Sequence, residues 1–399
     1  MFLATRLVLR YITGVSVRLQ VKALFLWYWK GFRSLNAYKK RQKAGKQYPP
    51  FLFLALTDAC NLRCKGCWIS RQDKARQLSL EQVDRIIESG KTQSSYYYTL
   101  LGGEPMLYPH LDAILKGHPD CYFQIITNGL FFDRETVQKL KAHGNVTPLV
   151  SLDGLGSFND QRRGEGVYNK ILDGLAELKR QKLLFGIATV VTAQNFENVL
   201  SDDYVRQIID FGAQYLWFYV FRPSGSNPSH ELALTQEQII EVRRRILTLR
   251  KRQPIIIIDT YWDANGRAVC PAAKGLGYHI GPAGSVEPCP PLSYACETID
   301  DNQSDLVETI ESSRYLAAFR EFVNSRTRGC VILERPGELA QFLRDSGAKD
   351  YSSRDDGIGE LACAACHPSH NQPDAELPED YWLYRFLKKQ LFFGLGAYG

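Results

Sequence analysis

The chain reads Asp58-Ala59-Cys60-Asn61-Leu62-Arg63-Cys64-Lys65-Gly66-Cys67 directly after the apolar run 51–56. Three thiolates at this spacing can bind three irons of a [4Fe–4S] cluster and leave the fourth iron open to a substrate or cofactor. A structural zinc site needs four closed protein ligands instead. The stretch therefore favours a cluster on Cys60, Cys64 and Cys67 over zinc or incidental thiols.

Short β-rich runs alternate with helical patterns on both sides of this stretch. Strands are predicted over 51–56, 96–101, 122–127, 147–152, 186–192 and 215–221, with helices over 79–89, 134–142, 168–182 and 204–211. Ser79 and Gln82 form a capping-box pattern at the start of the first helix. This alternation is typical of parallel βα units. Six such strands predict an α/β fold with an open barrel, in which active-site groups follow the strands.

Polar motifs that contain glycine follow three of these strands. They are Gly102-Gly103-Glu104-Pro105, Thr127-Asn128-Gly129 and Ser151-Leu152-Asp153-Gly154. Taken singly, each is an ordinary turn. Glycines also let the backbone approach a ligand closely, and Glu104 can accept a hydrogen bond from an ammonium group.

The cysteine stretch, Trp68 directly after it and the motif Gly-Gly-Glu-Pro together resemble the radical S-adenosylmethionine (radical SAM) superfamily. The resemblance implies a partial (β/α)6 barrel in which a [4Fe–4S] cluster cleaves S-adenosylmethionine reductively to give a 5′-deoxyadenosyl radical. It implies S-adenosylmethionine contacts from Gly102, Gly103, Glu104, Pro105, Thr127, Asn128, Ser151, Asp153, Arg163 and Asn195. No catalytic acid or base is assigned, and the implied reductant is flavodoxin or ferredoxin.

Further cysteines lie among glycines and prolines in the C-terminal third. Cys270 and Cys289, spaced as Cys-x13-Gly-x4-Cys, resemble the opening of the SPASM or twitch extension, which carries auxiliary clusters. The full seven-cysteine SPASM pattern is absent, so one auxiliary [4Fe–4S] cluster is expected, with candidate ligands Cys270, Cys289, Cys330, Cys363 and Cys366. Zinc on the last four of these, or inert thiols, are the alternatives. Cys296 is a weaker candidate, Cys121 is expected in the core, and His367 and His370 are expected to be solvated.

The basic character of the chain belongs to its N-terminus. Residues 1–57 contain eleven Lys or Arg and no Asp or Glu, whereas the other 342 residues carry 38 basic and 43 acidic groups. Basic residues interrupt the apolar runs of residues 1–31, so no span is expected there. An amphipathic, aromatic segment of this kind favours a membrane surface. The alternatives are a helix packed on the chain's own core or a nucleic-acid tail.

Four segments follow from these patterns. Residues 1–48 are a basic amphipathic segment and a predicted membrane-surface anchor, and 49–254 are the barrel. Residues 255–375 are a Cys-rich auxiliary-cluster module, and 376–399 an aromatic amphipathic tail. Ten cysteines are too sparse for a disulfide scaffold, which fits a reducing cytosol. Together with the predicted anchor, this places the protein in the cytoplasm, peripherally on the inner face of the membrane.

The reaction class leaves the substrate open. The aromatic termini favour hydrogen abstraction from a lipid or polyprenoid. The alternative is a peptide- or protein-modifying enzyme. Such relatives often carry an N-terminal recognition module, for which residues 1–48 are too short and too basic. An iron–sulfur scaffold or electron carrier has no use for an S-adenosylmethionine pocket, no cobalamin-binding domain fits the length, and no nucleic-acid partner is expected.

Overall fold

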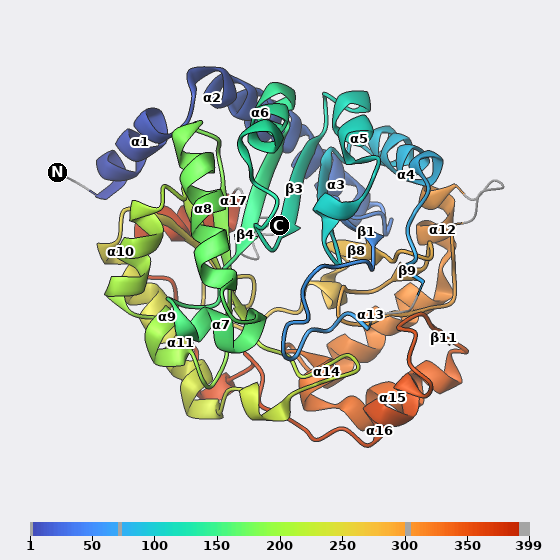
Figure 1. Cartoon of the computed structure of the whole chain (residues 1–399). Helices are drawn as coiled ribbons and strands as arrows, with labels where there is room; N and C mark the ends of the chain where they lie inside the picture. Colours follow the sequence, from blue (N-terminus) through green and yellow to red (C-terminus); the bar gives the residue numbers. More distant parts are fainter. Residues whose placement is uncertain (1–2, 71–73, 300–304, 391–399) are drawn as a thin grey trace.

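A nine-stranded sheet organises the computed structural model, which describes residues 3–70, 74–299 and 305–390 (Figure 1). Its strand order is β7-β6-β5-β4-β3-β2-β1-β8-β9, and every neighbouring pair is parallel except β8 and β9. The strands are β1 (Phe51–Thr57), β2 (Tyr97–Gly102), β3 (Tyr122–Thr127), β4 (Val146–Ser151), β5 (Gly186–Val191), β6 (Tyr215–Val220), β7 (Ile256–Ile258), β8 (Gly277–Ile280) and β9 (Val286–Glu287). The six predicted strands and the parallel α/β fold are confirmed.

Helices connect these strands along the outside of the sheet. They are α4 (Leu80–Thr92), α5 (Leu111–Gly117), α6 (Arg134–His143), α7 (Ser157–Arg163), α8 (Val167–Arg180), α9 (Phe196–Val199), α10 (Asp202–Asp210) and α11 (Gln236–Arg252). The four predicted helices correspond to α4, α6, α8 and α10. The capping box of α4 is present, because Gln82 N–H donates to Ser79 Oγ at 3.1 Å and Ser79 N–H donates to Gln82 Oε1 at 2.8 Å.

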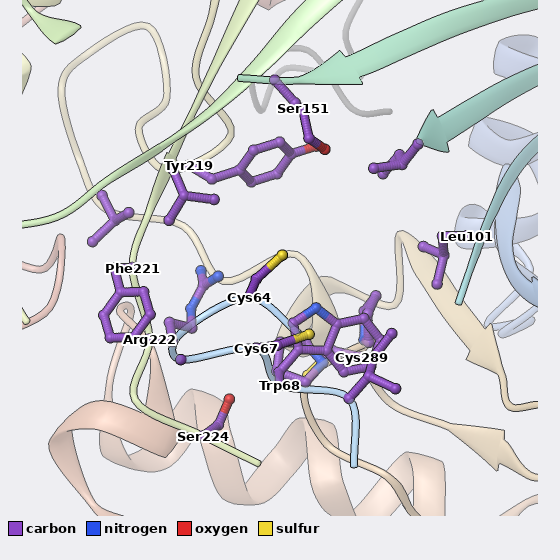
Figure 2. A pocket seen from close by; sticks show the side chains of 18 of the residues that line it. Cys64, Cys67, Trp68, Leu101, Ser151, Tyr219, Phe221, Arg222, Ser224 and Cys289 are labelled. Atoms are coloured by element: carbon purple, nitrogen blue, oxygen red, sulfur yellow. The ribbon is translucent and has the colours of Figure 1, made fainter. Parts of the chain in front are cut away.

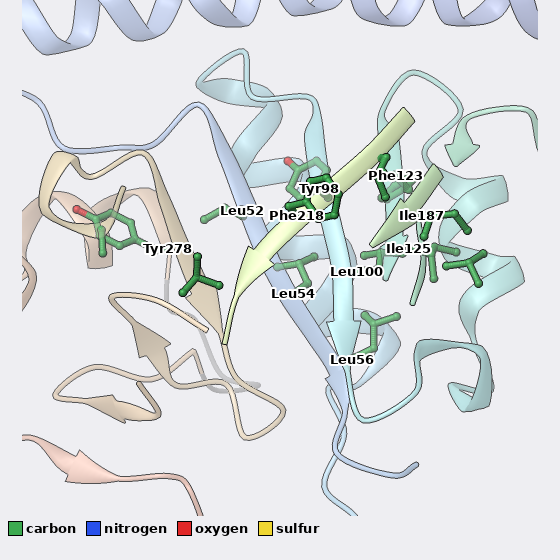
Figure 3. Close-up of a cluster of buried hydrophobic side chains, with 14 of the residues drawn as sticks. Leu52, Leu54, Leu56, Tyr98, Leu100, Phe123, Ile125, Ile187, Phe218 and Tyr278 are labelled. Carbon is green, nitrogen blue, oxygen red and sulfur yellow. The ribbon is translucent and has the colours of Figure 1, made fainter. Parts of the chain in front are cut away.

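Successive side chains of each strand point to opposite faces of the sheet, so the core has two layers. Leu52, Leu54 and Leu56 of β1 pack with side chains of β2 and β3 in the large core cluster between sheet and helices (Figure 3). Trp217 of β6 belongs to a second, smaller cluster on the inner face, where its ring stacks on Tyr219 at a centroid distance of 5.5 Å. Polar side chains also lie on the inner face, where Gln124 of β3 donates to Tyr215 Oη at 3.2 Å.

The C-terminal part of the chain joins the same sheet before it forms helices. β7 pairs with β6 at one side, and β8 pairs with β1 at the other, so the sheet continues past residue 254. The elements that follow are β10 (Tyr294–Ala295), α12 (Leu306–Ser312), α13 (Arg314–Arg326), α14 (Val331–Glu334), α15 (Pro336–Asp345), β11 (Lys349–Asp350) and α16 (Gly357–Ala362). Because β8 lies beside β1, this module is placed against the cysteine loop that follows β1.

The N-terminal helices pack across the end of the barrel where the strands begin. They are α1 (Leu3–Gly14), α2 (Val17–Ala23), the π-helix η1 (Leu24–Lys30) and α3 (Gly31–Lys43), and we call residues 3–43 the helical cap. Arg10 donates to Ala213 O at 2.7 Å, ahead of β6, and Arg18 donates to Ala142 O at 2.7 Å, ahead of β4. Within the described part of the chain, no helix has the length and apolarity to cross a bilayer.

A buried group of charges holds the C-terminal helix α17 (Trp382–Gln390) on the barrel. Lys388 Nζ lies 3.1 Å from Asp259 Oδ1, and Arg250 forms ion pairs with both Asp259 and Glu379. Burial alone raises the pKa of Asp259, but Arg250, Lys388 and Arg243 outweigh burial and hold that pKa well below its usual range. Asp259 and Glu379 are therefore the two anions that compensate three buried cations, and only Asp259 pairs with all three.

We expect Asp259→Asn to lower the free energy of unfolding by about 3–5 kcal/mol, because it leaves buried Lys388 without its carboxylate partner and Arg250 and Arg243 with Glu379 alone. The matched control is Asp380→Asn, which breaks only the exposed pair with Lys251 and costs about 0–1 kcal/mol. Thermal denaturation of the two variants beside the native protein measures the difference. Equal losses in the two variants would contradict the structural role of the buried group.

Candidate active site

A cavity of about 670 Å³ opens at the C-terminal ends of the strands. The cysteine loop after β1, the strand ends and the C-terminal module all contribute to its wall. Figure 2 shows Cys64 and Cys67 pointing into it, with Ser151 and Tyr219 from β4 and β6 on another side. Among the described residues, its wall contains four arginines, Arg63, Arg162, Arg163 and Arg222, and no Lys, Asp or Glu.

Backbone hydrogen bonds to the end of β2 hold the start of the cysteine loop. Gly103 N–H donates to Thr57 O and Glu104 N–H donates to Ala59 O, each at 2.7 Å. A Cβ added at Gly103 would lie 2.1 Å from Ala59 O, so only glycine allows this approach. The glycine pair therefore fixes the position of the loop and also lines the cavity.

Glu104 lies behind the cavity wall. Its carboxylate is 1% exposed and accepts hydrogen bonds from Asn128 N–H at 2.7 Å, Thr127 Oγ1 at 2.8 Å and Met106 N–H at 3.0 Å. Burial raises the pKa of Glu104 and outweighs these hydrogen bonds. In this arrangement the carboxylate joins the ends of β2 and β3.

Asp153 connects two arginines to the cysteine loop. Arg162 and Arg163 donate to its Oδ2 at 2.5 and 2.7 Å, and Arg163 Nη1 lies 4.0 Å from Cys64 Sγ. Burial raises the pKa of Asp153, but Arg163 and Arg162 outweigh burial and lower it overall. Asn195 supports the same turn by donating to Asp153 O at 2.8 Å. Asp153 and Asn195 thus position Arg163, which carries positive charge to the thiols.

The predicted S-adenosylmethionine contacts therefore fall into two groups. The cavity wall contains Gly102, Gly103, Thr127, Asn128, Ser151 and Arg163. Outside the wall lie Glu104, Pro105, Asp153 and Asn195. The second group supports the first, because its side chains or backbone hold the strand ends in place.

Three of the C-terminal cysteines line the same cavity as the first three. They are Cys270, Cys289 and Cys330. Burial raises the pKa of Cys270 to about 11 and also raises that of Cys289. Cys363 and Cys366 are exposed and lie outside the cavity wall, as does Cys296, whereas Cys121 is buried in the core as expected.

In the described residues, no three Cys, His, Asp or Glu side chains are close enough together to hold one metal ion. A cubane cluster has a different requirement, because each thiolate binds a different iron. The fit of Cys60, Cys64 and Cys67 to a cluster rests on their common loop and on the cavity that they border.

Sequence reasoning missed Arg222 and was wrong about His370. Arg222 follows β6 directly and stacks over the Tyr261 ring at 5.2 Å. Burial opposes its charge, but Tyr261 and the thiol of Cys330 raise the pKa of Arg222. His370 is 3% exposed rather than solvated; it hydrogen-bonds Val269 O at 3.1 Å, and burial lowers its pKa to about 3. The one sequence signal that could have predicted Arg222 at the cavity is its position just after a predicted strand.

A parallel barrel with a three-cysteine loop at its mouth defines a class of iron–sulfur enzyme, and residues 54–202 match the radical SAM superfamily. Residues 54–202 therefore belong to this superfamily. Its members are enzymes that bind S-adenosylmethionine and a [4Fe–4S] cluster, which are therefore the cofactors of this chain.

Two curated relatives are maturation proteins. The mycofactocin maturase MftC of Mycolicibacterium smegmatis is 28% identical over 266 residues, which cover 62% of this chain and 65% of MftC. The sporulation killing factor maturation protein SkfB of Bacillus subtilis is 24% identical over 299 residues, which cover 71% of this chain and 70% of SkfB. The match thus spans somewhat less than two thirds of MftC.

Solved structures share the fold. Streptococcus suis SuiB bound to the precursor peptide SuiA superposes with a TM-score of 0.60 at 18% identity, over 75% of this chain and 72% of SuiB. The protein anSMEcpe with bound AdoMet superposes with a TM-score of 0.54 at 17% identity, over 86% of this chain and 95% of that chain.

We expect Gly103→Ala to displace the cysteine loop, because its Cβ would collide with the backbone at Ala59. A displacement of about 1 Å lowers the rate of 5′-deoxyadenosine formation by about 100-fold. Gly117→Ala is the matched control, because its Cβ meets nothing within 4 Å. Chromatography measures 5′-deoxyadenosine formation by the two reconstituted variants. A normal rate in the Gly103 variant would contradict the proposed role of Gly103 in positioning the cysteine loop.

Proposed function

We propose that this chain is a radical SAM maturase that modifies a peptide. The observation that carries this proposal is one cavity bordered by two separate groups of three cysteines. The names of MftC and SkfB, and a SuiB structure that contains a precursor peptide, support a peptide as the substrate class. The lipid or polyprenoid substrate expected from the sequence has no such support among these relatives.

The cysteine loop after β1 and the neighbouring strand ends hold the cofactors. Cys60, Cys64 and Cys67 bind the cluster, and Arg163 offsets part of the negative charge of the thiolates. When bound and reduced, the cluster and S-adenosylmethionine supply a 5′-deoxyadenosyl radical that abstracts hydrogen from the substrate. The backbone at Gly102 and Gly103 orients S-adenosylmethionine together with the polar side chains of the cavity wall, which are Thr127, Asn128, Ser151 and Arg163.

Apolar side chains of the strands exclude water from this space. Phe53, Ile126 and Tyr219 project from three different strands into the cavity wall. Such a wall keeps water away from the radical and holds the substrate beside it. The cavity contains no carboxylate in its described wall, which leaves no acidic side chain there to act as a base.

Cys270, Cys289 and Cys330 hold one auxiliary [4Fe–4S] cluster in this proposal. Arg222 lies at the same wall and compensates their charge, as Arg163 does for the first group. Cys363 and Cys366, which the sequence offers as ligands, lie outside this wall in the structure. Flavodoxin or ferredoxin is the proposed reductant.

We also propose that the enzyme works at the inner surface of the membrane. The helical cap exposes apolar and aromatic side chains although it packs on the barrel. A lipid substrate is the second candidate function that this observation favours. The cap lies at the strand starts and the cavity at the strand ends, and this separation favours the peptide.

We expect replacement of Cys60, Cys64 and Cys67 by Ala to abolish 5′-deoxyadenosine formation, because the cluster loses all its protein ligands. Cys296→Ala is the matched control, since this exposed cysteine lies outside the cavity wall. Anaerobic assays with S-adenosylmethionine and dithionite measure the product. Continued formation in the triple variant would refute the proposed reaction.

Co-expression with the short peptides encoded beside the gene tests the substrate class. We expect a peptide whose mass changes only in the presence of the intact three-cysteine loop, as measured by mass spectrometry. Lipid extracts of the same cells serve as the comparison. An unchanged peptide together with a new lipid species would contradict the peptide proposal and favour the second candidate.

We expect Cys330→Ala to lose up to about four irons per chain, because it removes one ligand of the auxiliary cluster. Cys363→Ala retains its iron, since Cys363 lies outside the cavity wall. Iron analysis and electron paramagnetic resonance after anaerobic reconstitution measure both variants. Loss of iron from the Cys363 variant alone would contradict this assignment and indicate that the exposed cysteines bind the cluster.

A further inference from the structure

Exposed apolar side chains concentrate on the two terminal segments. Among the described residues, fourteen large hydrophobic side chains are substantially exposed, of which ten lie in the helical cap, two in α17 and two elsewhere. Those of the cap are Val8, Leu9, Ile12, Val17, Val21, Leu24, Phe25, Trp27, Trp29 and Phe32. An apolar surface of this extent marks a place of contact with a protein or a membrane.

The cations of the helical cap divide between two tasks. Arg10, Lys22, Lys30 and Arg41 turn toward the barrel, where they bind carbonyl groups or Asp120. Arg18 is exposed and also donates to Ala142 O. The other exposed cations of the cap are Arg6, Arg33, Lys39, Lys40 and Lys43, and the exposed Lys46 follows the cap. The cap and the segment up to residue 57 contain no acidic residue, so the apolar side chains lie among uncompensated positive charges. That combination complements an anionic lipid surface better than an apolar protein groove.

Contacts of the cap place it at the end of the barrel opposite the cavity. Tyr97 Oη, at the start of β2, donates to Leu26 O at 3.0 Å, and Trp27 packs edge-on against Tyr122 at the start of β3. The cysteine loop and the cavity lie at the other ends of these strands. In Figure 1, α1 and α2 lie at the top of the molecule and α14 to α16 at the bottom.

The terminal helix α17 adjoins this surface. Arg10 of α1 donates to Pro254 O, and Tyr384 of α17 donates to Ile255 O at 3.4 Å. Both helices therefore contact the same short segment ahead of β7. Trp382 and Phe386 are the two large hydrophobic residues that α17 exposes, on a helix that shares this segment with α1.

We infer that the helical cap and α17 bind an anionic membrane surface in one orientation, with the cavity facing the aqueous phase. This inference rests on the proposed membrane position and adds the contact face and the direction from which the substrate comes. A peptide enters the cavity from water, and a lipid in the supporting bilayer does not reach it. The orientation thus links a membrane-bound enzyme to a soluble substrate.

Sedimentation with vesicles of equal parts phosphatidylcholine and phosphatidylglycerol tests the contact face on the full-length holoenzyme. We expect Trp29→Ser with Phe32→Ser to lower the vesicle partition coefficient about tenfold or more. Lys39→Gln and Lys43→Gln lower it about fivefold each, and added salt lowers it further. The matched control is Leu107→Ser with Phe158→Ser, the two exposed hydrophobic residues outside the terminal helices, which leaves it unchanged.

Photo-crosslinking with a diazirine-bearing phosphatidylglycerol tests the orientation directly. We expect crosslinks within residues 8–32 and 382–386, and crosslinks near Leu107 or Phe158 would overturn it. Native protein that does not sediment with vesicles refutes the membrane position itself. Native protein that sediments, with the cap variant sedimenting equally, refutes only the contact face. A dimer in solution that the cap variant loses, without vesicle binding, would make the surface a contact between two copies.

Discussion

The pairing of β1 with β2 is the constraint on which the site depends. β1 continues into the cysteine loop, and the carbonyls of Thr57 and Ala59 accept hydrogen bonds from Gly103 and Glu104. These bonds set where the loop leaves the sheet. Since a Cβ at Gly103 would collide with Ala59 O, a side chain there is incompatible with the bonds. The three thiols reach the cavity because this backbone contact holds the loop from which they project.

The same strand also carries the second group of thiols to the site. β1 pairs with β2 on one side and with β8 on the other, so Phe51 lies opposite both Tyr97 and Gly277. Cys270 precedes β8 and Cys289 follows β9, and both border the cavity shared with Cys60. The parallel pairing of β1 with β8 thus helps to bring Cys270 and Cys289 to the first three cysteines, whereas Cys330 reaches the cavity from the start of α14. The strand starts, which carry no site residue, are free to hold the helical cap.

The six strands, four of the helices, the fold class and the first cysteine group were predictable because their signals are local. Strand period, the capping box of Ser79 and Gln82, and the cysteine spacing each lie within a few residues. The roles of Glu104 and His370 were not predictable in this way. Glu104 is satisfied by groups of β3, and His370 by Val269 about a hundred residues away. Burial by distant segments decided both environments.

The sequence by itself determined the chemistry that the chain carries, because the thiols, the glycine pair and the basic, acid-free N-terminus are properties of short stretches. Only the tertiary structure decided which of these groups meet. It brought Cys270, Cys289 and Cys330 to the first three cysteines and left Cys363 and Cys366 outside. It also showed that the N-terminal helices both pack on the barrel and expose an apolar face. The physical reason is that proximity and burial depend on long-range strand pairing and packing, which local sequence patterns do not encode.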